Sequence, residues 1–330
     1  MFAAYYRETG EAAHVLETGA MPVPVPAAGE VLVRLCCSGV NPSDVKKRAG
    51  KMPAPVAFGR IVPHSDGAGL IEAVGAGVDP ARIGSRVWLW NAQWRRAMGT
   101  AAAYCALPSA QAVPMAQNVG FEAGACLGIP AQTAWSAVMD GHPAPGRRVL
   151  VHGGAGAVGA LAIAIAAEAG ASVIATTSSP EKAAIARGSG ASHVLDYRKT
   201  DVVQAVNDLT AGAGVDHIVD VDLGANHGVN GAILAEGGSI AAYSAPSAPV
   251  FPLDYYAFAA RAARLRFVQV YLLDDTERQR AVSAVSALAA RGVIAPVIAR
   301  RYPLDQIVEA HLAQERGGLI GNIILDIAEP

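Results

Sequence analysis

The sequence predicts an α/β protein that consists of a β-rich domain and a doubly wound parallel-sheet domain. Two observations predict this fold class. Residues 1 to about 122 contain short strand patterns broken by Pro and Gly, whereas strand and helix patterns alternate from residue 149 onward. Parallel strands need long crossover connections, which are usually helices, so this alternation favours a parallel sheet. With 330 residues, 52% of them hydrophobic, the chain can fill two cores.

The first part of the chain has three clear strand candidates, at 31–37, 67–75 and 86–90. Apolar and β-branched residues in these segments are bordered by turn-forming residues, which is typical of a compact β domain. The pattern changes near Phe121, where an alanine-rich segment predicts one helix over 122–138.

The second part predicts an ordered series of strands and helices. Strands are expected at 149–151, 173–176, 193–195, 217–221 and 239–243. Helices are expected between most of them, at 158–169, 180–188, 201–209 and, shorter, 229–235. A further strand at 267–273, a helix at 276–291 and a last strand at 319–327 complete the expected elements.

A glycine-rich turn links the strand at 149–151 to the helix at 158–169, with the spacing GxxGxxG. In dinucleotide-binding folds the first glycine allows a tight turn, the second lets the backbone approach a pyrophosphate, and the third lets helix and strand pack closely. The N–H groups of the helix N-terminus also attract phosphate. We therefore expect a dinucleotide to bind at Gly153, Gly154, Ala155, Gly156, Ala157 and Val158.

The end of the next strand indicates which dinucleotide binds. Sites that select NAD place Asp or Glu there, to accept hydrogen bonds from the ribose hydroxyls. This chain has hydroxyl side chains at 176–179 and no carboxylate before Glu181. A carboxylate would repel a 2′-phosphate, whereas hydroxyls and the Lys182 ammonium would bind it. The expected cofactor is NADP(H).

Composition excludes several other classes of function. A net charge of −2 offers no basic surface for nucleic acid or membranes. The longest apolar run, 160–167, is too short to span a bilayer, and the N-terminus does not resemble a signal peptide. The four cysteines form no CxxC motif or disulfide framework, which favours reduced thiols in a cytoplasmic protein.

Four more segments lie in a recognisable order around the glycine turn: 38–45, 66–75 and 128–135 before it, and 318–325 near the end of the chain. Together they resemble the medium-chain dehydrogenase/reductase superfamily, in its zinc-independent NADPH:quinone oxidoreductase branch. The resemblance implies a chain with three parts that assembles as a dimer or a tetramer, and of these we expect the homodimer. The three parts are a GroES-like catalytic domain at 1–122, a Rossmann NADP-binding domain at 123–265, and an edge strand, a helix and a return to the catalytic domain at 266–330.

Zinc-dependent members of this superfamily hold catalytic zinc with a Cys and a His in two of these segments. At the corresponding positions this chain has Asn41 and Ser65, and His64 comes one residue too early. A catalytic zinc needs three protein ligands, so we expect no metal. Without a metal, the easier reaction is hydride delivery to an electron-poor acceptor, a quinone or an α,β-unsaturated carbonyl.

The resemblance also implies individual site residues. Ser178, Lys182 and Tyr197 are similar to residues that contact the 2′-phosphate in NADPH-dependent relatives. Asn41 and Asp44 lie in a loop that borders the nicotinamide in the family. Asn41 is expected to donate to a substrate carbonyl and Asp44 to order the loop or the ribose, with ordinary turn and helix-cap roles as the alternative. The other implied cofactor contacts are Thr133, Tyr243, Ser244, Val270 and Asn322.

One departure from the family concerns the substrate side. Many quinone reductases of this branch carry an aromatic residue two positions after the acid, where this chain has Lys46. Trp90 and Trp94 are candidates for an apolar wall, with core packing as the alternative. Two other functions stay open. One is an enoyl-thioester or alkenal reductase on the same scaffold, and the other is a non-catalytic, crystallin-like NADPH-binding protein.

Overall fold

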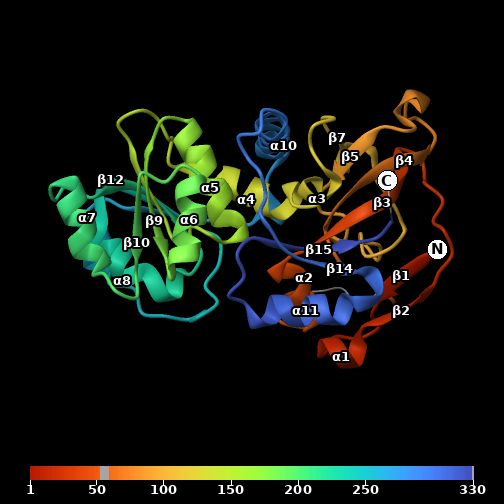
Figure 1. Cartoon of the computed structure of the whole chain (residues 1–330), viewed down its shortest axis with the longest axis horizontal. Coiled ribbons are helices and arrows are strands. Elements are labelled where there is room, and N and C mark those ends of the chain that lie inside the picture. The colour runs from red at the N-terminus through yellow and green to blue at the C-terminus, as the bar shows by residue number, and fades with distance from the viewer. Residues whose placement is uncertain (53–58, 329–330) are drawn as a thin grey trace. The chain divides into compact units, whose positions relative to one another are not determined.

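The structure is a computed structural model that describes residues 1–52 and 59–328 (Figure 1). The chain divides into two compact units, a first unit of Met1–Pro130 with Ser286–Pro330 and a second unit of Ala131–Val285. The chain therefore leaves the first unit once and returns to it. The expected functional domains 1–122, 123–265 and 266–330 have different borders from these units and stay a prediction; residues 53–58 and 329–330 lie outside the described part.

The second unit is built on a six-stranded sheet in the order β10-β9-β8-β11-β12-β13, with every neighbouring pair parallel. Counted along the chain, this order is 3-2-1-4-5-6, that of the doubly wound dinucleotide-binding fold. The order reverses between β8 and β11, and ligands in such sheets bind at this switch point. The strands are β8 (Arg148–Val151), β9 (Ser172–Thr177), β10 (His193–Asp196), β11 (Val215–Asp220), β12 (Leu234–Ala242) and β13 (Arg264–Phe267).

Helices cover this sheet in two groups. The helix α5 packs against α4 and α6 (Figure 1). The helix α8 packs against α7 and α9. Leu150, Ile218 and Ile240 lie fully buried in the sheet, and each contributes about 2 kcal/mol relative to an exposed side chain. These helices are α4 (Gln132–Asp140), α5 (Ala157–Glu168), α6 (Pro180–Gly188), α7 (Val202–Thr210), α8 (Leu223–Ile233) and α9 (Tyr255–Ala259). A further helix, α10 (Asp275–Ala290), begins in the second unit and ends in the first.

The first unit contains a seven-stranded sheet in the order β14-β15-β3-β4-β5-β7, with β6 paired to β3, and a separate β1-β2 pair. The last strand pairs antiparallel with β3, so the C-terminal segment completes the sheet that the N-terminal segment begins. The strands are β1 (Phe2–Tyr5), β2 (Glu17–Ala20), β3 (Glu30–Val40), β4 (Asp66–Val74), β5 (Arg86–Leu89), β6 (Tyr104–Pro108), β7 (Ala112–Pro114), β14 (Ile298–Pro303) and β15 (Asn322–Asp326).

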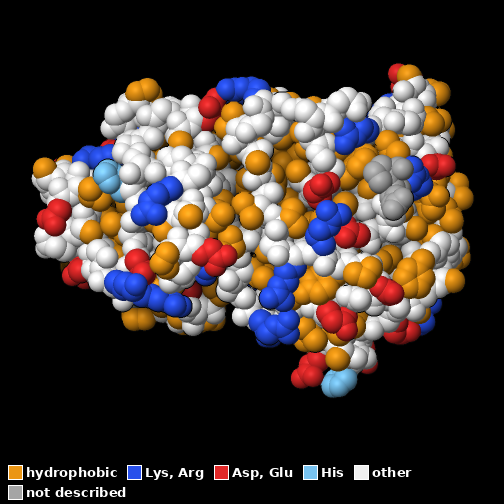
Figure 2. All heavy atoms as spheres, in the orientation of Figure 1, with side chains coloured by type: hydrophobic (Ala, Val, Ile, Leu, Met, Phe, Trp, Pro, Cys, Tyr) orange, Lys and Arg blue, Asp and Glu red, His pale blue; other side chains and the backbone are white. Residues whose placement is uncertain are grey.

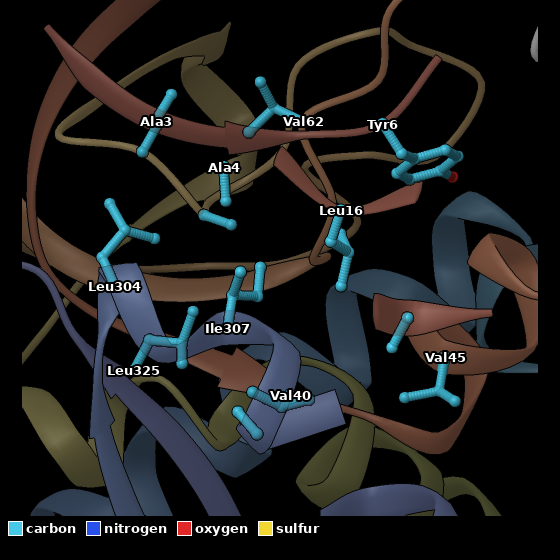
Figure 3. Packing of buried hydrophobic residues seen from close by; sticks show 14 of the residues in the cluster. Ala3, Ala4, Tyr6, Leu16, Val40, Val45, Val62, Leu304, Ile307 and Leu325 are labelled. Carbon is cyan, nitrogen blue, oxygen red and sulfur yellow. The ribbon is translucent and has the colours of Figure 1, made fainter. Parts of the chain in front are cut away.

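The helices of the first unit are α1 (Ala12–Val15), α2 (Pro42–Arg48), α3 (Phe121–Gly124) and α11 (Ile307–Arg316). A buried cluster fixes α2 in place. Val40, at the end of β3, and Val45, within α2, pack in one cluster with Ile307 and Leu325 (Figure 3). The residues between Val40 and Val45 are thereby held against the core.

Most of the expected elements are confirmed, and four predictions are wrong. The strand expected at 267–273 ends at Phe267, and Val270–Leu272 forms a 3₁₀ turn whose Val270 carbonyl accepts a hydrogen bond from Arg278. The segment expected at 229–235 is part of the longer helix α8. The loop expected after the first long strand is the helix α2, because Pro42 favours a first helical position.

The fourth correction concerns the single helix expected over 122–138. It is divided into α3, a π-helical turn at Leu127–Ala131, and α4. Pro130 lies inside that turn and has no N–H to donate, so the regular hydrogen-bond series is interrupted there.

Acidic and basic side chains are interspersed on the face displayed in Figure 2. Within the described part of the chain, none of the helices has the length and apolar character needed to cross a membrane.

Candidate cofactor and substrate sites

The glycine-rich turn lies in the second unit, between β8 and α5, at the switch point of the sheet. Gly153 has φ +69°, a left-handed conformation that favours glycine. A Cβ on Gly159 would lie 2.3 Å from the Gly153 carbonyl oxygen, so the helix packs tightly on the turn there. Of the residues that the structure describes, a Cβ on Gly156 would meet only that oxygen, at 3.3 Å, so they leave the space in front of Gly156 unfilled. A pyrophosphate fits this backbone cradle.

A buried polar network supports the turn from below. His152 Nδ1 lies 3.1 Å from Thr176 Oγ1, and His152 Nε2 lies 2.9 Å from Asn230 Oδ1. Asn230 Nδ2 donates to Asp220 Oδ2 over 2.6 Å, and Gly153 N–H donates to Thr176 Oγ1 over 3.3 Å. Burial lowers the pKa of His152. The ring is therefore neutral, with a hydrogen on Nε2 that it donates to Asn230.

The 2′-phosphate candidates meet at the carboxyl end of β9. Lys182 Nζ donates to Ser178 Oγ over 3.2 Å, and Tyr197 N–H donates to the Thr177 carbonyl over 3.1 Å. The Tyr197 side chain is half exposed. Asp196, on the neighbouring strand, is the register partner of Thr177. A carboxylate therefore stands on β10 beside the end of β9, although β9 itself ends without one.

That Asp196 carboxylate has cationic and N–H partners of its own. Arg198 N–H donates to Asp196 Oδ1 over 3.1 Å, and Lys199 Nζ lies 3.8 Å from Oδ2. Asp196 is thus partly neutralised, which lowers its repulsion of a nearby phosphate.

The other expected cofactor residues are distributed over the second unit. Thr133 is buried in α4. Tyr243 N–H donates to the Asp220 carbonyl, and the Ser244 carbonyl accepts from Leu223 N–H, so both residues follow β12 at the carboxyl edge of the sheet. Burial and the nearby Asp220 carboxylate raise the pKa of Tyr243. Val270, expected on a strand, lies in the 3₁₀ turn described above.

The substrate-side candidates of the first unit surround the start of α2. Asn41 is the N-cap of this helix and Asp44 is at its third position, where Asp44 Oδ2 accepts the Asn41 N–H over 3.0 Å. Asn41 Nδ2 donates to Asp66 Oδ2 over 2.8 Å. All three residues are buried. The helix-cap role considered for Asn41 and Asp44 is therefore real, and it orients both side chains.

Asp66 begins β4 and has no exposed surface. Its Oδ2 also accepts the Ile129 N–H over 2.8 Å, which the π-helical turn presents to it. Burial and the nearby Asp44 carboxylate raise the pKa of Asp66 well above the usual value for an aspartate, although hydrogen bonds from Ile129 and Asn41 oppose this shift. The raised pKa favours the protonated, neutral form of Asp66 over the ionised form.

A buried ammonium adjoins these carboxyl groups. Lys47 Nζ donates to Ser65 Oγ and to Gln93 Oε1, each over 3.3 Å, and lies 5.7 Å from the centre of the Trp94 ring. Ser65 Oγ lies 3.4 Å from Asp44 Oδ1. Burial lowers the pKa of Lys47, and Asp44 and Asp66 oppose that shift. Lys46, singled out from the sequence, is only partly buried.

A second series of hydrogen bonds reaches Asp66 through its main chain. Thr100 Oγ1 donates to the Asp66 carbonyl over 2.5 Å and lies 2.7 Å from Ser38 Oγ. Ser38 Oγ lies 2.9 Å from His64 Nδ1, and His64 Nε2 lies 2.9 Å from His311 Nε2.

Asn322 is the first residue of β15. Its N–H and its Nδ2 both donate to the Val297 carbonyl, over 2.8 and 3.0 Å.

Comparisons with known proteins agree with this geometry. A family model described as an alcohol dehydrogenase GroES-like domain matches residues 27–117, and one described as a zinc-binding dehydrogenase matches residues 189–325. A quinone oxidoreductase of Pongo abelii is 29% identical over 92% of this chain and 91% of its own length. The structure of a mycobacterial protein complexed with NADPH is 30% identical with a TM-score of 0.88, over 99% of this chain and 100% of that chain. The chain belongs to the medium-chain dehydrogenase/reductase superfamily, in its quinone oxidoreductase branch.

Membership in this superfamily confirms the expected combination of a GroES-like and a Rossmann-type fold and makes the chain an oxidoreductase. It does not by itself select a cofactor. The structure of an NAD-dependent alcohol dehydrogenase is also similar, with 29% identity, a TM-score of 0.87, and coverage of 99% of this chain and 100% of that chain. The choice between dinucleotides depends on this chain's own residues at the end of β9.

The zinc of the superfamily's metal-dependent members does not fit the residues of this chain. An amide and a hydroxyl, Asn41 and Ser65, replace a thiolate and an imidazole. The Lys47 ammonium donates to Ser65, so a positive charge already lies where a cation would have to bind. Among residues 1–52 and 59–328, no three His, Cys, Asp or Glu side chains form a group that could hold a metal ion.

Sequence reasoning missed several buried polar residues of this superfamily member. Lys47, Asp66 and Gln93 lie around Asn41 and Asp44, and His152 and Asn230 lie below the glycine turn. The sequence contained one signal for Lys47. Charged residues on a short helix between two apolar strands cannot all face solvent, so burial of one of them could have been expected. For His152, the position directly before the glycine turn was the available signal.

Proposed function

We propose that this chain transfers a hydride from NADPH to a quinone or an α,β-unsaturated carbonyl compound, without a metal ion. The observation that carries this proposal is the pair of Lys182 and Ser178 at the end of β9, next to a glycine turn with room for a pyrophosphate. An ammonium and a hydroxyl favour a 2′-phosphate over the free ribose hydroxyls of NADH. The mycobacterial structure complexed with NADPH supports the same cofactor.

The chain's own groups have separate tasks in this proposal. The N–H groups at the start of α5, beginning at Ala157 and Val158, have no acceptor within the helix and bind the pyrophosphate. Ser178, Lys182 and Tyr197 bind the 2′-phosphate. When bound, NADPH supplies the hydride, and the protein supplies orientation and hydrogen bonds.

On the substrate side, we propose that Asn41 donates a hydrogen bond to the carbonyl oxygen of the acceptor. Its amide carries two hydrogens, and only one of them is needed for the bond to Asp66. Hydride addition places negative charge on that oxygen, so a fixed donor stabilises the product-like transition state more than the substrate. Asp44 holds the Asn41 backbone at the start of α2.

We also propose that the chain forms a homodimer through the edge strand β13. Within residues 1–52 and 59–328 this strand pairs with β12 alone, and Phe267 on it is 72% exposed. Tyr255 and Tyr256, on α9, are 70% and 80% exposed, and Leu272 is 63% exposed. An edge strand with exposed apolar side chains is a template for pairing with another chain. Light scattering should give a dimer mass for the wild type and a monomer mass for Phe267→Lys.

The location that we propose is the cytoplasm. Cys36, Cys37, Cys105 and Cys126 are all unpaired and buried, as expected for a protein of a reducing compartment. Cell fractionation with a marker enzyme would test this.

Oxidation of NADPH with 1,4-benzoquinone, an alkenal, an enoyl thioester and a simple ketone tests the proposed reaction. Turnover of the quinone or the alkenal, and a slower reaction with the ketone, is expected. Faster turnover of an enoyl thioester than of any quinone would make the chain an enoyl-thioester reductase. Binding of NADPH without turnover of any acceptor would make it a binding protein, and a preference for NADH would contradict the cofactor assignment.

A further inference from the structure

We propose that Asp66 is a positioning residue of this chain, which fixes the Asn41 amide through the hydrogen bond from Asn41 Nδ2 to Asp66 Oδ2. The part of the proposal that concerns catalysis rests on the proposed function, because it is Asn41 that would contact the acceptor. Asp66 itself lies entirely below the surface and acts through Asn41.

The two oxygens of the Asp66 carboxyl group have different surroundings. Oδ2 accepts two N–H groups, from Asn41 and from Ile129, each over 2.8 Å. Oδ1 is buried, and no donor of the described part of the chain reaches it. An ionised carboxylate with one bare oxygen would be costly at such a place, whereas a neutral acid with its hydrogen on Oδ1 keeps Oδ2 as an acceptor.

The charges around Asp66 agree with a neutral acid. Asp44 lies close enough to disfavour a second negative charge, and the Cys126 thiol is a further group that interacts with it. The Lys47 ammonium is the nearby group of opposite sign, and it already hydrogen-bonds Ser65 and Gln93. Burial is the largest cause of the raised pKa of Asp66.

The fold holds Asp66 from three sides. Thr100 Oγ1 donates to the Asp66 main-chain carbonyl. A Cβ on Gly128 would lie 2.0 Å from Asp66 Oδ1, so only a glycine leaves room for the acid. The next residue, Ile129, supplies its N–H because the π-helical turn interrupts the helix there. Such turns occur frequently at functional sites.

The protonation state of Asp66 has a consequence for the proposed reaction. Hydride transfer leaves negative charge on the acceptor oxygen that Asn41 binds. An ionised Asp66, one hydrogen bond behind Asn41, would oppose that charge, whereas the neutral acid orients the amide without adding charge. The proposed reaction therefore needs a neutral hydrogen-bond acceptor at position 66. An Asn side chain at this position can also act as one.

The structural half of the proposal can be tested on the full-length chain without any substrate. The infrared difference spectrum between the wild type and Asp66→Asn at neutral pH should contain the band of one protonated carboxylic acid. In a chain labelled with ¹⁵N-asparagine, the Asn41 side-chain signal, assigned by its loss in Asn41→Ala, should be protected from hydrogen exchange. Asp66→Asn should keep this protection and Asp66→Ala should lose it. The exposed Asp79→Asn is the matched control and should lack the infrared band.

The catalytic half is tested by a double-mutant cycle on kcat with a quinone and NADPH. Loss of one hydrogen bond predicts a kcat about tenfold lower for Asp66→Ala and a kcat within about threefold of the wild type for Asp66→Asn. Because Asp66 acts through Asn41, Asp66→Ala should lower kcat no further in an Asn41→Ala background. The Kd for NADPH should stay unchanged in all these variants.

The outcomes separate this proposal from the proposed function. Absence of turnover in the wild type, with the infrared band and the amide protection present, would reject the function and keep the positioning of Asn41. Additive losses of kcat, or equal kcat in Asp66→Ala and the wild type, would reject the catalytic half alone. An unprotected Asn41 amide in the wild type would overturn the proposal itself, and absence of the infrared band would reject the neutral state of Asp66 and with it the catalytic half. Because Asp66→Asn keeps the shape of the side chain, the infrared band and the wild-type amide protection remain measurable if Asp66→Ala does not fold.

Discussion

The Nε2 atoms of His64 and His311 lie 2.9 Å apart in the core of the first unit, so only one of them carries a hydrogen. The neighbouring groups decide which one. Thr100 uses its hydrogen on the Asp66 carbonyl, so Ser38 must donate to Thr100 and His64 Nδ1–H must donate to Ser38. His64 Nε2 is then the acceptor and His311 Nε2–H the donor. Both rings are neutral, and the hydrogen bonds all run in one direction.

This neutral pair predicts a loss of stability in acid. Burial lowers the pKa of His64 from 6.5 to about 4, and it also lowers the pKa of His311, which faces His64 and Arg48. A folded-state pKa below the unfolded one means that the unfolded chain binds the proton first. The stabilisation that the neutral histidine pair gives the folded state is therefore complete above pH 6.5 and is lost as the pH falls to about 4. The pKa shift of His64 corresponds to about 3 kcal/mol of this stabilisation.

Denaturant unfolding between pH 7.5 and pH 4 measures this loss. His64→Asn is the informative variant, because His64 has φ 77° and Asn tolerates a left-handed conformation better than most residues. We expect this variant to be less stable at pH 7.5 and to lose less stability in acid than the wild type. The exposed His14→Asn should follow the wild-type curve. Equal pH slopes for His64→Asn and the wild type would contradict the prediction.

The glycine turn offers a matched pair of substitutions. Gly156→Ala adds a methyl group to the unfilled space in front of the turn, so it should leave unfolding nearly unchanged and raise the Kd for NADPH at least tenfold, about 1.4 kcal/mol. Gly159→Ala places its methyl group 2.3 Å from the Gly153 carbonyl and should lower the free energy of unfolding by about 2 kcal/mol. Calorimetric titration and thermal unfolding distinguish the two. Unchanged NADPH affinity in Gly156→Ala would mean that the pyrophosphate binds elsewhere.

Lys182 predicts the preference between the two dinucleotides. Removal of one charge-assisted hydrogen bond to a phosphate costs about 2 kcal/mol, so Lys182→Ala should raise the Kd for NADPH about thirtyfold and leave that for NADH unchanged. Arg187→Ala, on the same helix and exposed, is the control for general charge effects. Equal losses for NADPH and NADH, or a wild type that prefers NADH, would count against the assignment.

Local patterns were enough to predict the fold of the second unit. The GxxGxxG turn, the apolar strands and the caps leave marks within a few residues, and α6 begins and ends at the residues expected from Pro180 and the pattern after it. The strand expected at 267–273 failed for a non-local reason, because Arg278 binds the Val270 carbonyl and outweighs the strand propensity of this segment.

The candidate site was harder to predict, because its contacts also join residues that are far apart in the sequence. Asn41 and Asp44 could be selected from their segment, but Asp66 and Ile129 meet Asn41 only through tertiary packing. The residues of β9 alone also did not indicate Asp196. The register between β9 and β10 cannot be predicted from either strand by itself.

The buried ammonium of Lys47 gives the last prediction, and Lys46 on the same helix is its matched control. Lys47→Met removes the donor to Ser65 and Gln93 and leaves the Asp44 carboxylate without its cation. Loss of one partner of a buried charge pair costs about 3 kcal/mol, whereas Lys46→Met should change the free energy of unfolding by less than about 0.5 kcal/mol. If the unpaired charge of Asp44 is the cause, Lys47→Met with Asp44→Asn should recover much of the loss, since Asn still offers an acceptor to the Asn41 N–H. Denaturant unfolding at pH 7.5 measures all four chains, and equal effects of the two lysine substitutions would show that the Lys47 ammonium is not held in this cluster.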